Sequence, residues 1–172
     1  MSSALASIER AVRVLSDISQ GIRGRVVRSR ELDAKTINVA SQLAGLVEGI
    51  SGGLRTLEGK LKASGSVEGV SRISPYTYLV VDGERVIVLR SRPEYMVLSI
   101  ESKGSSISIK TRNSAISIKP DSISITARGV SVEVNPFSVE DYQVKREELR
   151  NALKSIDRVV NQRLIQVVEW KT

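Results

Sequence analysis

Between Met96 and Val134 the apolar residues recur with a period of two, and this alternation constrains the fold more than any other feature. Successive side chains of a β-strand point to opposite faces, so the pattern predicts strands with one buried and one hydrated face. Turn-forming pairs separate the short strands, as expected for an antiparallel meander. The apolar positions are Leu98/Ile100, Ile107/Ile109, Ile116/Ile118, Ile123/Ile125 and Val130/Val132/Val134.

Two further features extend this β region. Residues 77–81 and 85–89 flank Asp82-Gly83, a preferred pair for a tight hairpin turn. The segments 106–110 and 115–119 are near copies, and with 122–126 they form a short internal repeat. The sequence therefore predicts an antiparallel β-meander of about seven short strands.

Heptad-like spacing marks three helical segments on either side of the meander, at about 3–22, 31–62 and 139–170. Apolar residues in each follow steps of four and three, which places them on one helical stripe. Gly52 and Gly53 predict a kink or a break in the second helix. Ser138 is a suitable N-cap for the third helix, whose seam is interrupted by Arg163.

The fold class predicted is therefore α+β, with helices flanking a sheet. We expect an N-terminal helical region at 1–64, an antiparallel β region at 65–135 and a C-terminal helix at 136–172 that packs back on the first region. Two long helices flanking β-hairpins make a plan similar to that of prefoldin chaperone subunits, although this chain has more strands and an additional N-terminal helix. The resemblance implies a holdase activity and a sheet at one end of the helical hairpin.

Composition limits the chemistry available to this chain. It contains no Cys and no His, which excludes thiolate chemistry, disulfides, nearly all zinc sites and the usual general base. No phosphate loop, nucleophile elbow or dinucleotide fingerprint is present. We therefore expect no catalytic residues, no metal, no cofactor and no small-molecule substrate.

Apolar runs reach about four residues, as at Val86 to Leu89, whereas a membrane span needs about 20. Charged residues also interrupt the first 20 positions, unlike a secretion signal. These features predict a soluble, cytoplasmic protein without a membrane partner. The heavy use of Arg, Val and Ile is typical of a thermophilic source.

The net charge of +7 is concentrated in two blocks. The first contains Arg23, Arg25, Arg28 and Arg30, whose planar guanidinium groups suit phosphates. The second lies on the hydrated strand face and includes Lys110, Arg112 and Lys119. Both are candidate contacts to a DNA or RNA backbone, independent of base sequence. The alternative for the first block is a solvated loop whose arginines pair with Glu31 and Asp33.

Half of the six aromatic residues lie close together in the β region, at Tyr76, Tyr78 and Tyr95. Grouped tyrosines can anchor a partner. On general frequencies they more often complete the edge of a core, and we predict that role here.

The function predicted from these observations is non-catalytic assembly or scaffolding, with self-association through helical seams or the sheet face. One alternative is a nucleic-acid-binding subunit of a larger ribonucleoprotein complex, which would use the Arg-rich loop, and a second is a prefoldin-like holdase. Arg163 either occupies the third seam or points to solvent while Leu164 replaces it. The predicted interface residues are Ile8, Leu15, Ile22, Leu149, Ile156, Arg163 and Trp170.

Overall fold

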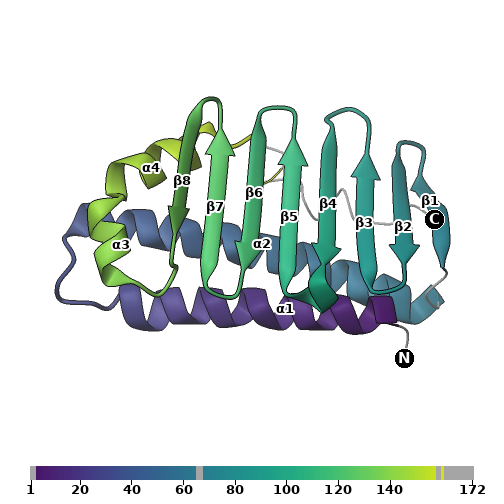
Figure 1. Cartoon of the computed structure of the whole chain (residues 1–172), viewed down its shortest axis with the longest axis horizontal. Coiled ribbons are helices and arrows are strands. Elements are labelled where there is room, and N and C mark those ends of the chain that lie inside the picture. The colour runs from purple at the N-terminus through teal and green to yellow at the C-terminus, as the bar shows by residue number, and fades with distance from the viewer. Residues whose placement is uncertain (1–2, 65–67, 158–159, 161–172) are drawn as a thin grey trace.

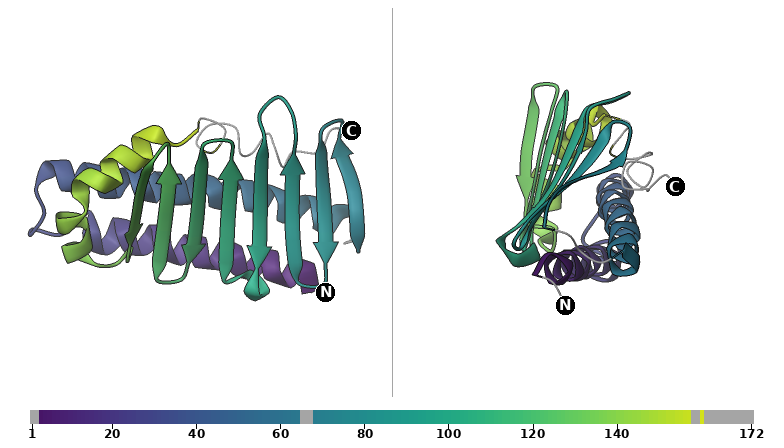
Figure 2. Two further views of the ribbon diagram at one scale, coloured as in Figure 1. Left: turned by 45° about the horizontal axis from the view of Figure 1, so that its top comes forward. Right: turned by 90° about the vertical axis from the view of Figure 1, so that its right-hand side faces the viewer.

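The computed structural model describes residues 3–64, 68–157 and 160, and confirms the α+β class. An antiparallel sheet forms one layer, and helices pack on one of its faces (Figures 1 and 2). The helical elements are α1 (Ser3–Gly21), the π-helical turn η1 (Ile22–Val26), α2 (Ala34–Ser64), the 3-10 turn η2 (Ser102–Gly104), α3 (Val139–Val144) and α4 (Arg146–Ser155). The strands are β1 (Gly69–Ser74), β2 (Thr77–Asp82), β3 (Arg85–Arg90), β4 (Met96–Glu101), β5 (Ser106–Thr111), β6 (Ser114–Lys119), β7 (Ser122–Ala127) and β8 (Val130–Val134).

The sheet is an eight-stranded meander in which strand order follows chain order and every neighbouring pair is antiparallel. The prediction of about seven strands missed β1. This strand contains Gly, Ser and Arg, and its pairing with β2 is irregular between Arg72 and Ser74, so its sequence does not alternate clearly.

The alternating pattern gives one buried face, as predicted, because the Ile-x-Ile residues of β5, β6 and β7 are all buried. The sequence left open what covers this face, and in the structure the helices of the same chain do so (Figure 2). The repeated segments are these three neighbouring strands. Their intervening serines are half-buried on the opposite face, where they form a row in cross-strand register. The row consists of Ser99, Ser108, Ser117 and Ser124.

Helices α1 and α2 run antiparallel to each other and across the strands (Figure 1). The 31 residues of α2 give a length of about 46 Å at 1.5 Å per residue. Eight strands about 4.8 Å apart span roughly 34 Å, so one such helix crosses the whole sheet. The sheet therefore covers the helices along their length, unlike the expected arrangement with the sheet at one end. Helix α2 also continues through Gly52 and Gly53 without a break.

Helix α1 lies beside the turns at one end of the strands (Figure 2). Gly104, in the β4–β5 turn, has a φ of +96°, and a Cβ at this position would overlap the Ser7 carbonyl oxygen and the Arg10 Cβ. Glycine is therefore required at this position for two reasons: its positive φ and the close approach of the turn to α1. This contact fixes the β4–β5 turn on the helix.

The C-terminal helix differs from the prediction of one helix at 139–170. It breaks at Lys145, where φ is −104° and ψ is 16°, and α4 ends at Ser155. Residues 158–159 and 161–170 of the predicted helix lie outside the described residues. Ile156 is extended because the Asp157 backbone N–H donates to Ser114 Oγ at 3.0 Å, a tertiary bond that competes with helix continuation. The predicted cap is confirmed, since Ser138 Oγ accepts from the Asp141 N–H at 3.1 Å.

Within the described ranges, no helix has both the length and the apolar character that a membrane crossing requires.

Candidate nucleic-acid interface

The apolar residues predicted to form an intermolecular seam lie in the core of the single chain. Ile8, Leu15 and Ile22 of α1 and η1 are fully buried beneath the sheet, as is Leu149 of α4. Ile156 is 7% exposed. Arg163 and Trp170 lie outside the described residues. The helical seams within the described ranges therefore pack against the chain's own sheet.

Arg23, the first residue of the predicted Arg-rich loop, is engaged within the fold. It lies in η1 and donates to Glu48 at 2.8 Å and to Ser41 at 2.7 Å, both on α2. The hydrogen bond from Arg23, together with its positive charge, lowers the pKa of Glu48. Arg23 thus joins the first helix to the second.

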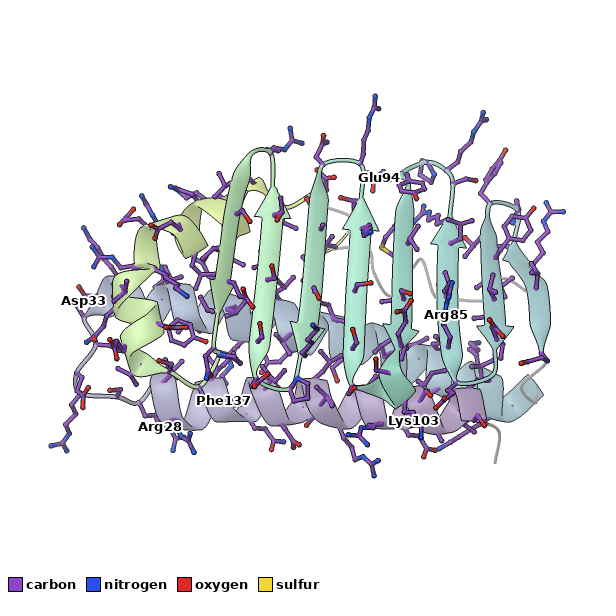
Figure 3. All side chains as sticks on the ribbon, viewed as in Figure 1. Arg28, Asp33, Arg85, Glu94, Lys103 and Phe137 are labelled. Atoms are coloured by element: carbon purple, nitrogen blue, oxygen red, sulfur yellow. The ribbon has the colours of Figure 1, made fainter. Side chains whose placement is uncertain are left out.

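Arg25, Arg28 and Arg30 are exposed at the connection between α1 and α2. None of them forms an ion pair with an acidic side chain of the described chain. The expected neutralisation by Asp33 is replaced by other contacts: its carboxylate accepts from the Thr36 N–H at 2.8 Å and from Arg146 at 2.9 Å. Figure 3 shows Arg28 and Asp33 at this end of the molecule, pointing apart.

The predicted basic residues of the sheet separate into two groups. Lys110 lies near the end of β5, and Arg112 follows it in the β5–β6 hairpin loop. Lys119 lies at the far end of β6, opposite Ser122 across the β6–β7 turn. The structure therefore brings Lys110 and Arg112 together and leaves Lys119 at the other end of the sheet.

Four hairpin loops lie side by side at the sheet end that contains Arg112, and we call them the loop rim (top of Figure 1). They connect alternate strand pairs, so successive loops are about 10 Å apart. The loop rim comprises Pro75–Tyr76, Ser91–Tyr95, Arg112–Asn113 and Arg128–Gly129.

Charge differs between the two ends of the sheet. The loop rim contains three arginines (Arg92, Arg112 and Arg128) and one acidic residue, Glu94. The turns at the opposite end contain one lysine and two acidic residues; they are residues 83–84, 102–105 and 120–121. The basic excess of the sheet is thus directed toward the loop rim.

Exposed tyrosines lie among these arginines. Tyr76 and Tyr95 each leave 48% of their surface exposed, and Tyr78 leaves 36%, so the predicted role at a core edge is wrong for this group. The Arg92 guanidinium lies 5.8 Å from the centre of the Tyr76 ring, within the range of a cation–π contact. Sequence reasoning missed this combination because only the hairpin register brings residues 76, 92, 95 and 112 to one end.

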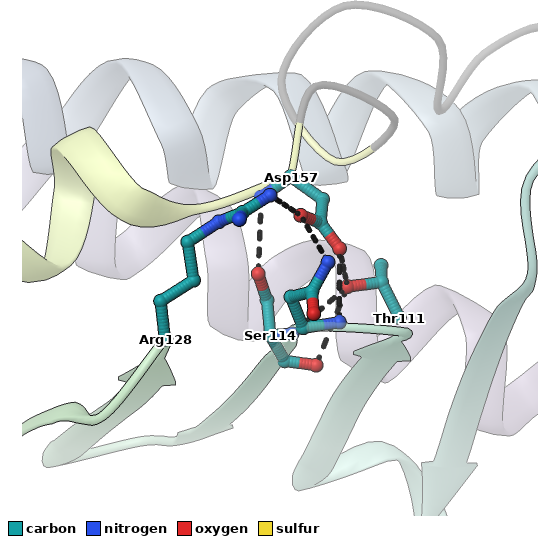
Figure 4. Close-up of polar contacts among 5 residues, drawn as sticks. Thr111, Ser114, Arg128 and Asp157 are labelled. Carbon is teal, nitrogen blue, oxygen red and sulfur yellow. Dashed lines mark hydrogen bonds and ion pairs between the residues drawn. The ribbon is translucent and has the colours of Figure 1, made fainter.

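Asp157 fastens the segment after α4 to the loop rim (Figure 4). Its carboxylate accepts from Thr111 Oγ1 at 2.6 Å, from the Asn113 N–H at 3.0 Å and from Arg128 at 3.2 Å. Partial burial opposes ionisation, but these hydrogen bonds and the charge of Arg128 outweigh it and lower the pKa of Asp157. The carboxylate therefore stays ionised and neutralises Arg128, whereas Arg112 has no ionic partner among the described residues.

A pocket of about 470 Å³ opens between the β3–β4 and β5–β6 loops of the rim. Its lining residues include one aromatic ring, two guanidinium groups, a carboxamide and two carboxylates. They are Ser91, Pro93, Glu94, Tyr95, Arg112, Asn113, Arg128 and Asp157.

A second hollow, of about 290 Å³ and basic in its lining, lies between α2 and α4. Lys35, Arg146, Arg150 and Lys154 line it, with Glu147 as its one acidic residue. Glu147 is shared, because it pairs with both Arg146 and Arg150. Helix α4 packs beside β7 and β8 and leads to Asp157, so this groove lies close to the loop rim.

The two hollows supply cations and hydrogen-bond donors, and the rim pocket also contains the exposed ring of Tyr95. In the described part of the chain, no three acidic side chains gather in a way that could hold a metal ion. Comparisons of the chain with protein-family models, with curated proteins and with solved structures find no match.

Proposed function

We propose that this protein is a non-catalytic, cytoplasmic nucleic-acid-binding protein that holds the phosphate backbone along its loop rim. The observation that carries the proposal is the alternation of exposed tyrosines with arginines along the rim. The order of the loops gives Tyr76, Arg92, Tyr95 and Arg112, and Arg92 lies over the Tyr76 ring. Arginine presents a planar fork of donors that matches phosphate oxygens. Exposed rings offer additional stacking area to bases.

Backbone contacts of this kind are independent of base sequence. Each phosphate that a cation neutralises releases counterions, so the logarithm of the affinity falls linearly with the logarithm of salt concentration. The slope is roughly −0.9 per phosphate on duplex DNA and roughly −0.7 on single strands. Salt dependence therefore reports how many cations contact the backbone.

Replacing Arg92 and Arg112 with Gln tests this assignment. We expect weaker binding to all DNA and RNA sequences alike, and a salt slope on duplex DNA that is flatter by about 1.8. Fluorescence anisotropy with labelled DNA and RNA at several salt concentrations measures both effects. Both side chains are exposed, so thermal stability should change little.

Two matched variants locate the contact. Lys103→Gln with Lys119→Gln removes two cations from the opposite end and should leave the slope unchanged. Arg25→Gln with Arg28→Gln removes two from the α1–α2 connection. If only this last variant flattened the slope, the contact would belong to the Arg-rich loop. Absence of affinity in the parent protein at low salt would refute nucleic-acid binding altogether.

Self-association through the sheet is the second candidate function. Val70, Val80 and Ile87 form a cross-strand row on the outer face, and Val70 leaves 70% of its surface exposed on the edge strand β1. The other edge, β8, contacts α4, whereas β1 has β2 as its only partner strand among the described residues. Pairing of β1 with β1 of a second copy would extend the apolar row across a two-fold axis.

A further inference from the structure

The rim pocket has the dimensions and the lining of a site for one flat polar ring. Its volume of about 470 Å³ lies within the usual range of small-ligand pockets, about 300 to 1,000 Å³. Tyr95 supplies an aromatic wall at the mouth, and 48% of its surface remains exposed. Ser91 and the Asn113 carboxamide add groups that both donate and accept hydrogen bonds.

Four charged side chains line the pocket: Arg112, the half-buried Glu94, and the pair formed by Arg128 and Asp157. Arg128 and Asp157 are 3.2 Å apart and neutralise each other. Arg112 is exposed at the mouth, and no acidic side chain of the described chain pairs with it. If a nucleotide entered the pocket with its base against Tyr95, its phosphate would meet the Arg112 guanidinium at the surface.

We infer that the rim pocket binds an unpaired nucleobase, with the adjoining phosphate on Arg112, and that this makes the interface selective for single-stranded nucleic acid. The inference rests on the proposed function and narrows its ligand. A recess between two hairpin loops can receive a base only when that base leaves its stack. This costs a few kcal/mol in a duplex and least in a single strand. Ring stacking accepts every base, so the selectivity is for strandedness and not for sequence.

The test compares a labelled single-stranded oligodeoxythymidylate with a duplex of equal length, by anisotropy at matched salt. The parent should bind the single strand more tightly. Tyr95→Leu should lower single-strand affinity about tenfold, the loss of one stacked base, and leave duplex affinity unchanged. Tyr95→Phe keeps the ring and should bind as the parent does.

Tyr78→Leu is the matched control, because Tyr78 is exposed on the outer sheet face and does not line the pocket. It should leave the ratio of single-strand to duplex affinity unchanged. Equal losses in the Tyr95 and Tyr78 variants would overturn the base pocket. If the parent bound the single strand and the duplex equally well, the base pocket would also be overturned. The proposed function would still stand in that case if the variant lacking Arg92 and Arg112 bound both nucleic acids more weakly. Absence of binding to either would refute both.

Discussion

A single residue, Asp157, fixes both the end of α4, through its backbone N–H, and the loop rim, through its carboxylate. Its bonds reach Thr111 and Asn113 of one hairpin and Arg128 of the next. A residue two positions beyond the end of α4 thus contacts residues that lie 29 to 46 positions earlier in the sequence. Nothing in the local sequence around Asp157 predicts these partners, because they are brought together by the sheet register.

Asp157→Asn should destabilise the fold at neutral pH by about 1–3 kcal/mol, the usual cost of losing hydrogen bonds to a charged group. The folded pKa of Asp157 is lowered, so its stabilisation is complete above the unfolded value of about 3.9 and is lost as pH falls through the folded pKa. Urea unfolding of parent and variant should therefore differ most near pH 7 and least near pH 2. Asp121→Asn, at an exposed turn of the opposite end, is the control. An equal difference at both pH values would show that the charge of Asp157 does not stabilise the fold.

Among the elements, the edge strand β1 governs the second candidate function. Gly69 has a φ of +102°, and the register shifts after Arg72, which leaves a short regular segment for pairing with another chain. Natural edge strands are often shortened or distorted in this way, which limits uncontrolled aggregation. Association through β1 is therefore expected to stop at a dimer and not to continue into larger assemblies.

Val70→Lys should abolish this association without unfolding the chain, because the side chain is 70% exposed. Light scattering at micromolar concentration should give the parent a mass of twice 18.8 kDa and the variant the mass of a monomer. Val144→Lys, at a residue of α3 that is 69% exposed, should remain a dimer. A monomeric parent over the whole concentration range would rule out the dimer.

Elements with strong periodicity could be predicted from the sequence. The four-and-three spacing of Ile8, Leu15 and Ile22 predicts α1, and the alternation from Leu98 to Val134 predicts β4 to β8. The partner of each stripe could not be predicted, since a heptad seam is compatible with another helix or with a sheet. Here the seams pack under the sheet, and the end of α4 is set by tertiary hydrogen bonds of Asp157.

In the whole molecule, the direction of each strand determines at which end of the sheet the following loop and its charged residues lie. Alternate hairpins point to opposite ends, so Arg92, Arg112 and Arg128 gather at the loop rim, and acidic turn residues gather beside α1. The sequence indicates the basic blocks but not this sorting, which depends on the number of strands between them. Lys119, predicted to act with Lys110 and Arg112, lies at the other end for this reason.

Amide hydrogen exchange with and without single-stranded oligodeoxythymidylate shows whether the loop rim contacts nucleic acid. We expect slower exchange in segments that contain residues 75–76, 91–95, 112–113 and 128–129. Exchange should be unchanged at the opposite turns, residues 83–84, 102–105 and 120–121. Protection confined to those opposite turns, or to the Arg-rich connection at residues 23–30, would contradict a contact at the loop rim.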